Sequence, residues 1–209
     1  MKIYSKLKAD NKPFIFIHIG KCGGSTIANT LRNHNIKFDR VHATRPQYQS
    51  DKKYLISLRN PVERFVSAFY WRKRLVSTQQ QDRFYGEYKF FQKFKTIEDL
   101  INNDITILRK NYAHHIKEDI NFYLGDFVNQ CDPTNVIGIV CTENLNKDIE
   151  NIFDIKVREV HINTNNNKKE LQEKYRESLK KYLYKDYLII EKLNNLKLLT
   201  REQYEILSR

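Results

Sequence analysis

The chain has 209 residues, and its 37 Lys and Arg against 25 Asp and Glu leave a formal net charge of +12. A hydrophobic share of 40% and an aromatic share of 12% exclude a disordered chain, and only 6 Gly and 4 Pro exclude collagen-like and low-complexity sequences. No run approaches the roughly 20 apolar residues of a membrane span, and 3 Cys at no metal-ligand spacing indicate neither a disulfide framework nor a metal site.

Apolar runs rich in β-forming residues predict buried strands at 14–19, 54–59 and 135–141, with a weaker candidate at 38–43. Helices are predicted at 25–33, from Pro61 to about residue 75, and from residue 168 onward. Residues 77–83 are polar and predict a loop. Strands that alternate with helices predict an α/β fold with a mainly parallel central sheet flanked by helices and a helical C-terminal part.

The length favours one domain over residues 1–209, with a polar tail at about 1–12 and a helical insertion at about 77–130. Two helix starts carry clear signals. Asn60 is a good N-cap before Pro61, with Glu63 three residues on, and Thr96 has Asp99 at the same spacing. The absence of an apolar leader before the first strand favours a cytoplasmic protein.

Three of the glycines lie in the segment Gly20-Lys21-Cys22-Gly23-Gly24, between the first strand and the first helix. Glycine lets backbone N–H groups approach an anion there, and the helix N-terminus adds its positive dipole end. Lys21 adds a full charge, and Ser25 and Thr26 add hydroxyl donors. A tight turn without a ligand is the alternative, but this combination favours a phosphate site. The order of residues matches neither the nucleotide-triphosphate loop nor the dinucleotide pattern, so no metal is expected.

A second anion site is predicted where the next strand ends. Arg59 lies at its carboxyl end, where ligands of open α/β sheets gather, and Ser67 follows eight residues later on the helix that Asn60 caps. A guanidinium fork with a hydroxyl suits a terminal phosphate. A structural salt bridge and a surface serine remain the alternative.

Together the two segments resemble the cofactor motifs of sulfotransferases that use 3′-phosphoadenosine 5′-phosphosulfate (PAPS), most closely the glycan-type branch with the type 2 sulfotransferase domain. Residues 16–26 resemble the 5′-phosphosulfate loop, with Gly20 in place of the usual proline, and residues 59–71 resemble the 3′-phosphate motif. Shorter similarities lie at 141–145 and 184–187. The resemblance implies a P-loop-like three-layer fold, release of the bisphosphate PAP, and cofactor contacts from Lys21, Cys22, Gly23, Gly24, Ser25, Thr26, Arg59 and Ser67.

Sulfuryl transfer to a hydroxyl needs a base, and His42 has the best position among six histidines, at the end of the weak strand between the two motifs. The resemblance implies the same role for His42, and a second catalytic role for Lys21, which would stabilise the leaving PAP. Glu63 is a weaker candidate, because helix capping explains it. His18 is expected to be a hydrogen-bonded core residue. His114 and His115 adjoin on a predicted helix and lack a partner at metal spacing.

The acceptor is less determined. A carbohydrate hydroxyl is the first expectation, a protein tyrosine the second, and a small metabolite stays open. Basic residues 72–74 are expected to form a solvated helix end, and aromatic residues at 70, 71, 84, 85 and 88 could stack on a sugar or belong to the core. Two rival functions remain, a P-loop kinase or NTPase that needs magnesium, and a basic nucleic-acid-binding module drawn by the charge.

Overall fold

The computed structural model describes residues 12–110, 115–157 and 171–209. Within these residues, parallel strands form one sheet in the order β2-β1-β3-β4. In chain order they are β1 (Phe14–Ile17), β2 (Phe38–Val41), β3 (Tyr54–Leu58) and β4 (Val136–Cys141). Since β1 pairs with both β2 and β3, the turns that follow β1 and β3 leave the sheet side by side at its carboxyl edge.

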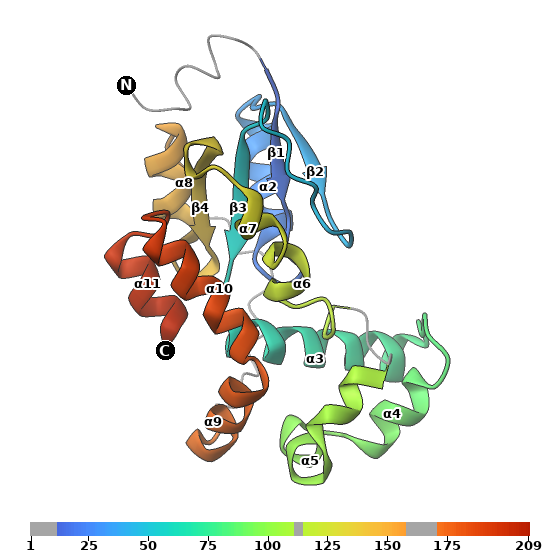
Figure 1. The fold of residues 1–209 in the computed structure, drawn as a ribbon. Helices are drawn as coiled ribbons and strands as arrows, with labels where there is room; N and C mark the ends of the chain where they lie inside the picture. The colour runs from blue at the N-terminus through green and yellow to red at the C-terminus, as the bar shows by residue number, and fades with distance from the viewer. Residues whose placement is uncertain (1–11, 111–114, 158–170) are drawn as a thin grey trace.

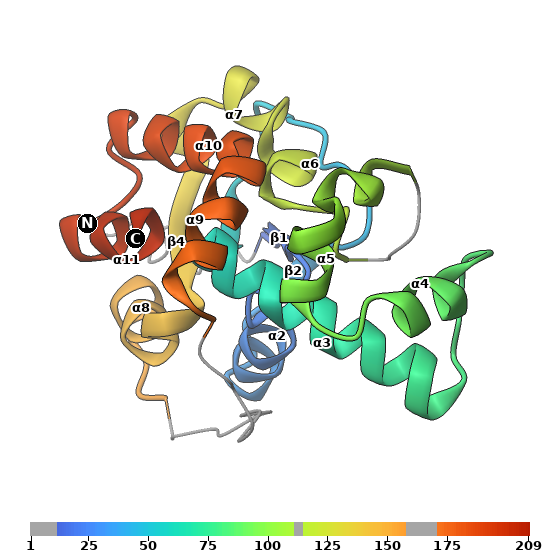
Figure 2. The ribbon, with the colours of Figure 1, turned by 90° about the horizontal axis from the view of Figure 1, so that it is seen from below.

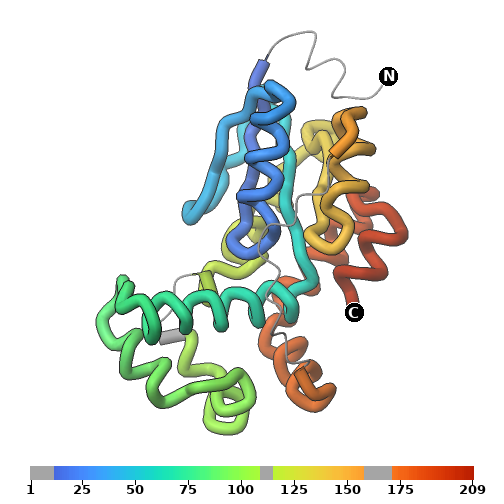
Figure 3. The backbone as a smooth tube through the Cα atoms, turned by 180° about the vertical axis from the view of Figure 1, so that it is seen from behind, coloured from blue at the N-terminus to red at the C-terminus, as the bar shows by residue number. Residues whose placement is uncertain are grey.

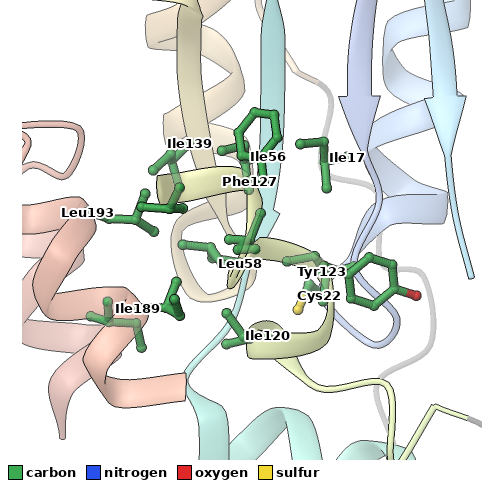
Figure 4. Packing of buried hydrophobic residues seen from close by; sticks show 14 of the residues in the cluster. Ile17, Cys22, Ile56, Leu58, Ile120, Tyr123, Phe127, Ile139, Ile189 and Leu193 are labelled. Atoms are coloured by element: carbon green, nitrogen blue, oxygen red, sulfur yellow. The ribbon is translucent and has the colours of Figure 1, made fainter. Parts of the chain in front are cut away.

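Helices cover both faces of this sheet (Figure 1, Figure 3). On one face, α2 (Gly24–Asn33) and α8 (Leu145–Phe153) pack on a cluster that includes Phe16, Leu55 and Val140. The opposite face packs against four helices, α6 (Ile120–Leu124), α7 (Phe127–Gln130), α10 (Tyr184–Asn195) and α11 (Arg201–Ser208). Figure 4 shows side chains of β1, β3 and β4 meeting side chains of α6, α7 and α10. The expected α/β arrangement of a parallel sheet between helical layers is confirmed.

A third apolar cluster lies below the carboxyl edge of the sheet, where α3 (Pro61–Gln79) crosses (Figure 2). Against it pack α4 (Glu87–Lys93), α5 (Ile97–Asn103) and α9 (Glu173–Tyr182). Short 3₁₀ turns complete the described elements: η1 (Ile105–Lys110), η2 (Pro133–Asn135) and η3 (Thr142–Asn144). The helical insertion expected at about 77–130 therefore contains α4 to α7, although residues 111–114 lie outside the described part.

The helix starts follow the sequence signals. Asn60 caps α3 by accepting from the backbone N–H of Val62 and Glu63, and Thr96 and Asp99 form a capping box at the start of α5. The predicted strand at 14–19 ends two residues early, because the Ile19 N–H donates to the Ser57 hydroxyl at 3.1 Å instead of joining the ladder.

Two helix boundaries differ from the prediction by several residues. Helix α3 continues to Gln79, through the first three residues of the predicted loop at 77–83, because its exposed last turn accepts polar residues as readily as a loop does. The helix predicted from residue 168 begins at Glu173, and residues 168–170 lie outside the described part, as does nearly all of the N-terminal tail. None of the described helices has both the length and the apolar character that crossing a bilayer requires.

The expectation of a solvated basic end at 72–74 is wrong for Arg72, which is fully buried. Its Nε donates to Glu87 Oε1 at 2.7 Å, and a second contact joins Nη2 to Oε2. Glu87 Oε2 also accepts from the backbone N–H groups of Arg83 and Phe84. The sequence pattern hides this pair, because the carboxylate comes from another helix 15 residues on.

Replacing one partner of this ion pair should destabilise the protein more than replacing both partners. We expect Arg72→Met to lower the free energy of unfolding by about 3–5 kcal/mol, because Glu87 is left as an uncompensated buried charge. The double variant with Glu87→Met should recover most of that loss. Urea unfolding of the three proteins measures both effects, and equal losses in the single and double variants would contradict this account.

Candidate functional site

The turn after β1 is built to present its backbone at the start of α2. Lys21 and Gly23 both adopt the left-handed conformation, each with φ 69°, and Gly23 is the N-cap of α2. The Ser57 hydroxyl of neighbouring β3 accepts from the Ile19 N–H and donates to the Ile17 carbonyl at 3.3 Å. The root of the turn is thereby fixed to the strand that carries Arg59.

Two glycines of the turn make room for imidazole rings. A Cβ on Gly20 would lie 2.6 Å from Nδ1 of His115, and a Cβ on Gly24 would lie 1.9 Å from Cδ2 of His18. Both distances are below any normal contact, so the two rings occupy the space that side chains would need. The need for glycine at position 24 comes from this packing and not from its backbone angles, because no positive φ occurs there.

Lys21 is half-buried and faces aromatic and cationic neighbours. Its Nζ lies 4.7 Å from the ring centre of Trp71 on α3. Burial, followed by the nearby charges of Arg59 and Arg74, lowers the pKa of Lys21 from 10.5 to about 8. An ammonium so close to several other cations favours an anion beside it.

Arg59 reaches the same turn from the end of β3. Its Nη1 donates to the backbone carbonyl of Lys21 at 3.4 Å, and its Nε lies 3.6 Å from Oε1 of Glu143, which follows β4. Nε is buried and has no hydrogen-bond partner within the described residues. The two predicted anion sites therefore meet, because β1 and β3 are paired neighbours in the sheet.

The remaining predicted ligand residues differ in what they present. The Cys22 side chain is fully buried in the apolar cluster of Figure 4, its N–H donates to the Ile19 carbonyl at 3.2 Å, and burial raises its thiol pKa to about 12. Ser25 is exposed and Thr26 half-buried in the first turn of α2. Ser67 is half-buried two turns into α3. The Cys22 thiol is thus unsuited to ligand contact, while the hydroxyls remain accessible.

His42 stands next to the turn and has a defined orientation. Its Nδ1 lies 2.9 Å from the backbone carbonyl of His18, and its ring stacks on the His18 ring with 4.1 Å between centres. Since a carbonyl can only accept, the neutral ring carries its proton on Nδ1 and leaves Nε2 as the basic nitrogen. His18 itself is buried, and burial followed by His42 lowers its pKa to about 3. The hydrogen bond expected for His18 is not found at Nδ1 within the described residues.

His115 belongs to the site, which the sequence analysis did not foresee. It lies in a turn with φ 63° and not on the predicted helix, while His114 and His161 lie outside the described residues. Its ring centre is 5.1 Å from that of His42 and 5.3 Å from that of Trp71. Glu118 Oε2 lies 3.0 Å from Nδ1 of His115.

Arg64 explains how His115 is held there. The fully buried guanidinium donates to the backbone carbonyls of His115 at 2.8 Å, Ile116 at 3.3 Å and Glu118 at 3.3 Å. These bonds secure the segment over the Gly20 turn. The repeated arginine in the sequence Arg59-Asn-Pro-Val-Glu-Arg64 was the available signal, but nothing in it indicated which chain segment Arg64 would bind.

Lys21, Arg59 and the imidazole of His42 therefore lie around one glycine turn at the carboxyl edge of the parallel sheet. The Nε2 of His42 is the ring nitrogen that can accept a proton. Such an arrangement can bind an anionic group and remove a proton from a hydroxyl beside it. No group of three His, Cys, Asp or Glu side chains suited to a metal ion occurs in the part of the chain that the structure covers. Comparisons with family models, curated proteins and solved structures give no match.

The packing of imidazole rings on the glycine turn predicts that alanine at position 24 lowers stability much more than alanine at position 25. Gly24→Ala should lower the melting temperature and cost about 1–3 kcal/mol, because its Cβ must displace the buried His18 ring. Ser25→Ala, one residue later on the exposed side of α2, is the matched control and should change stability by less than about 0.5 kcal/mol. Thermal unfolding compares the two, and an undisturbed Gly24→Ala protein would contradict this packing.

Proposed function

We propose that the chain is a sulfotransferase with a P-loop-like core, which moves a sulfuryl group from PAPS to an acceptor hydroxyl. The observation that carries the proposal is the contact between Arg59 and the Lys21 turn, at 3.4 Å. A donor with phosphate groups at its 5′ and 3′ positions needs two cationic sites within the span of one nucleotide. The buried Arg59 Nε without a hydrogen-bond partner among the described residues supports an anion at the second site.

Lys21 and the turn would hold the 5′ end of the donor, which supplies an activated sulfuryl group when bound. Backbone N–H groups at the start of α2 and the helix dipole favour negative oxygens there, as do the Ser25 and Thr26 hydroxyls. The Lys21 ammonium lies on the same turn, where it would neutralise charge that develops on the leaving phosphate. Arg59 and Ser67 would bind the 3′-phosphate.

His42 is the base in this proposal. Its Nδ1 is oriented by the His18 carbonyl, so its Nε2 can accept the proton of the acceptor hydroxyl. The ring lies between His18 and His115, which limits its rotation. This orientation distinguishes His42 from His34, which is exposed at the end of α2.

A carbohydrate hydroxyl is the proposed acceptor. Arg45, three residues after His42, lines a pocket of about 410 Å³. The other walls of this pocket include Tyr48, Phe122, Asp126 and Gln130. Aromatic faces combined with charged and amide groups suit a sugar ring, which has apolar C–H faces and many hydroxyls. Arg45 and Asp126 pair at 3.4 Å across this pocket and are both largely exposed.

The cofactor proposal is tested before any acceptor is known. PAP should raise the melting temperature more than ADP or ATP, with or without magnesium, and titration calorimetry should give PAP at least about tenfold tighter binding than ADP. Arg59→Ala should abolish this preference. Arg201→Ala, which removes an exposed arginine of α11, is the control and should retain it.

A magnesium-dependent preference for ATP would instead favour a kinase or NTPase. Strong binding of random DNA that falls steeply with salt would favour a nucleic-acid-binding module. Either result, together with no preference for PAP over ADP, would contradict the proposed sulfotransferase.

The lowered pKa of Lys21 predicts a pH dependence of PAP binding. Below about pH 8 the ammonium is charged before the anion arrives, whereas above it each binding event must first take up a proton. The logarithm of the affinity should therefore fall more steeply between pH 8 and 9.5 in the unmodified chain than in Lys21→Arg, which stays charged. The difference should approach one log unit per pH unit, and parallel profiles would contradict the assignment.

A further inference from the structure

Arg59 already has an anionic neighbour in the protein. Glu143 lies in η3, directly after β4, and its Oε1 is 3.6 Å from Arg59 Nε. The two residues follow neighbouring strands, since Leu58 pairs with Cys141 in the parallel ladder. The Thr142 hydroxyl donates to the Leu58 carbonyl at 3.1 Å and holds the turn of Glu143 against the end of β3.

The Arg59–Glu143 pair is shielded from water, but it leaves N–H donors of the guanidinium available to a ligand. The side chains of Arg59 and Glu143 are 15% and 28% exposed. A guanidinium has five N–H donors. Within the described residues, one Nη1 donor bonds the Lys21 carbonyl and the Nε donor lies near Glu143. A phosphate can thus reach Arg59 while Glu143 stays in place, which brings two negative groups onto one cation.

The surroundings of Glu143 make its charge costly. Burial raises the pKa of its carboxyl, opposed by Arg59 and by a bond from the Asn60 backbone, while the charge of Glu63 raises it further. Arg176 pairs with Glu63 at 2.9 Å. The thiols nearest the site, Cys22 and Cys141, are buried, and burial raises their pKa values well above neutrality. Burial therefore favours the protonated form of Glu143, and the carboxyl lies directly beside the Arg59 guanidinium.

We propose that Glu143 is the internal counter-ion of the Arg59 site and takes up one proton from solvent when a phosphate dianion binds Arg59. The inference rests on the proposed function only for the identity of the phosphate, the 3′-phosphate of the donor. Two like charges on one buried guanidinium favour the uptake of one proton, and the burial of the Glu143 carboxyl, which disfavours its charged form, directs that proton to Glu143 in this proposal. A nucleotide with a 3′-hydroxyl leaves the Arg59–Glu143 pair intact, so Glu143 would make recognition of the 3′-phosphate proton-coupled.

The test is titration calorimetry with PAP at pH 7.0, in buffers of different ionisation enthalpy, on the unmodified chain and on Glu143→Gln. The number of protons taken up per PAP should be higher in the unmodified chain, approaching one more than in Glu143→Gln. The variant should bind PAP about tenfold tighter, because its amide carries no charge to repel the phosphate. Protons exchanged by Lys21 are common to both proteins and cancel in the difference, and infrared difference spectra distinguish a proton on the carboxyl from a proton on the phosphate.

Glu202→Gln is the matched control, because it makes the same change in an exposed ion pair with Lys147. It should behave as the unmodified chain in both readouts. ADP should give no difference in proton uptake between the unmodified chain and Glu143→Gln. Should Glu143→Gln fail to fold, infrared difference spectra of the unmodified chain still test the inference, since PAP should produce the band of a protonated carboxyl.

Equal proton uptake and equal PAP affinity in the unmodified chain and Glu143→Gln would overturn the inference while leaving the sulfotransferase proposal standing. If PAP shows no preference over ADP, inorganic phosphate is the second probe. Phosphate binding that needs Arg59 and shows the same difference in proton uptake between the unmodified chain and Glu143→Gln would keep the role of Glu143 and refute the sulfotransferase. Binding of neither ligand would overturn both.

Discussion

The site depends on one constraint, the parallel pairing of β1 with β3, which places the carboxyl ends of the two strands side by side. Parallel pairing of β1 with β3 brings the Lys21 turn and Arg59 together, and the Ser57 hydroxyl ties the root of that turn to β3. Pairing of β3 with β4 then adds Glu143. The backbone pairing of three strands thereby brings Arg59 within a few ångströms of both the Lys21 backbone and the Glu143 carboxylate, although these residues lie far apart along the chain.

The electrostatics of the site follow from this crowding. Burial, followed by the nearby charges of Arg59 and Arg74, lowers the pKa of Lys21, and the carboxylate of Glu143 lies beside Arg59. The imidazoles of His18, His42 and His115 stack on one another beside these groups. The site therefore combines cationic groups with the imidazole of His42, whose Nδ1 is oriented by the His18 carbonyl, and the proposed transfer from an anionic donor to a hydroxyl needs both.

Rigidity of the site comes from the layers beneath it. Buried Arg64 on α3 binds the carbonyls of residues 115, 116 and 118, so the helix that begins beside Arg59 also fixes His115 over the glycine turn. Farther along α3, the buried pair of Arg72 and Glu87 secures α4. One helix therefore connects the end of β3 at Arg59, the imidazole stack and the lower apolar cluster.

The sequence by itself determined the strands, the parallel α/β class, the caps at Asn60 and Thr96 and the glycine turn, because these depend on local periodicity and on backbone chemistry within a few residues. It also singled out Lys21, His42 and Arg59, since each lies at the end of a predicted strand. Only the tertiary structure decided that His115, Arg64 and Glu143 join them and that Arg72 is buried. Their partners come from other segments, and neither periodicity nor capping carries information about contacts so distant along the chain.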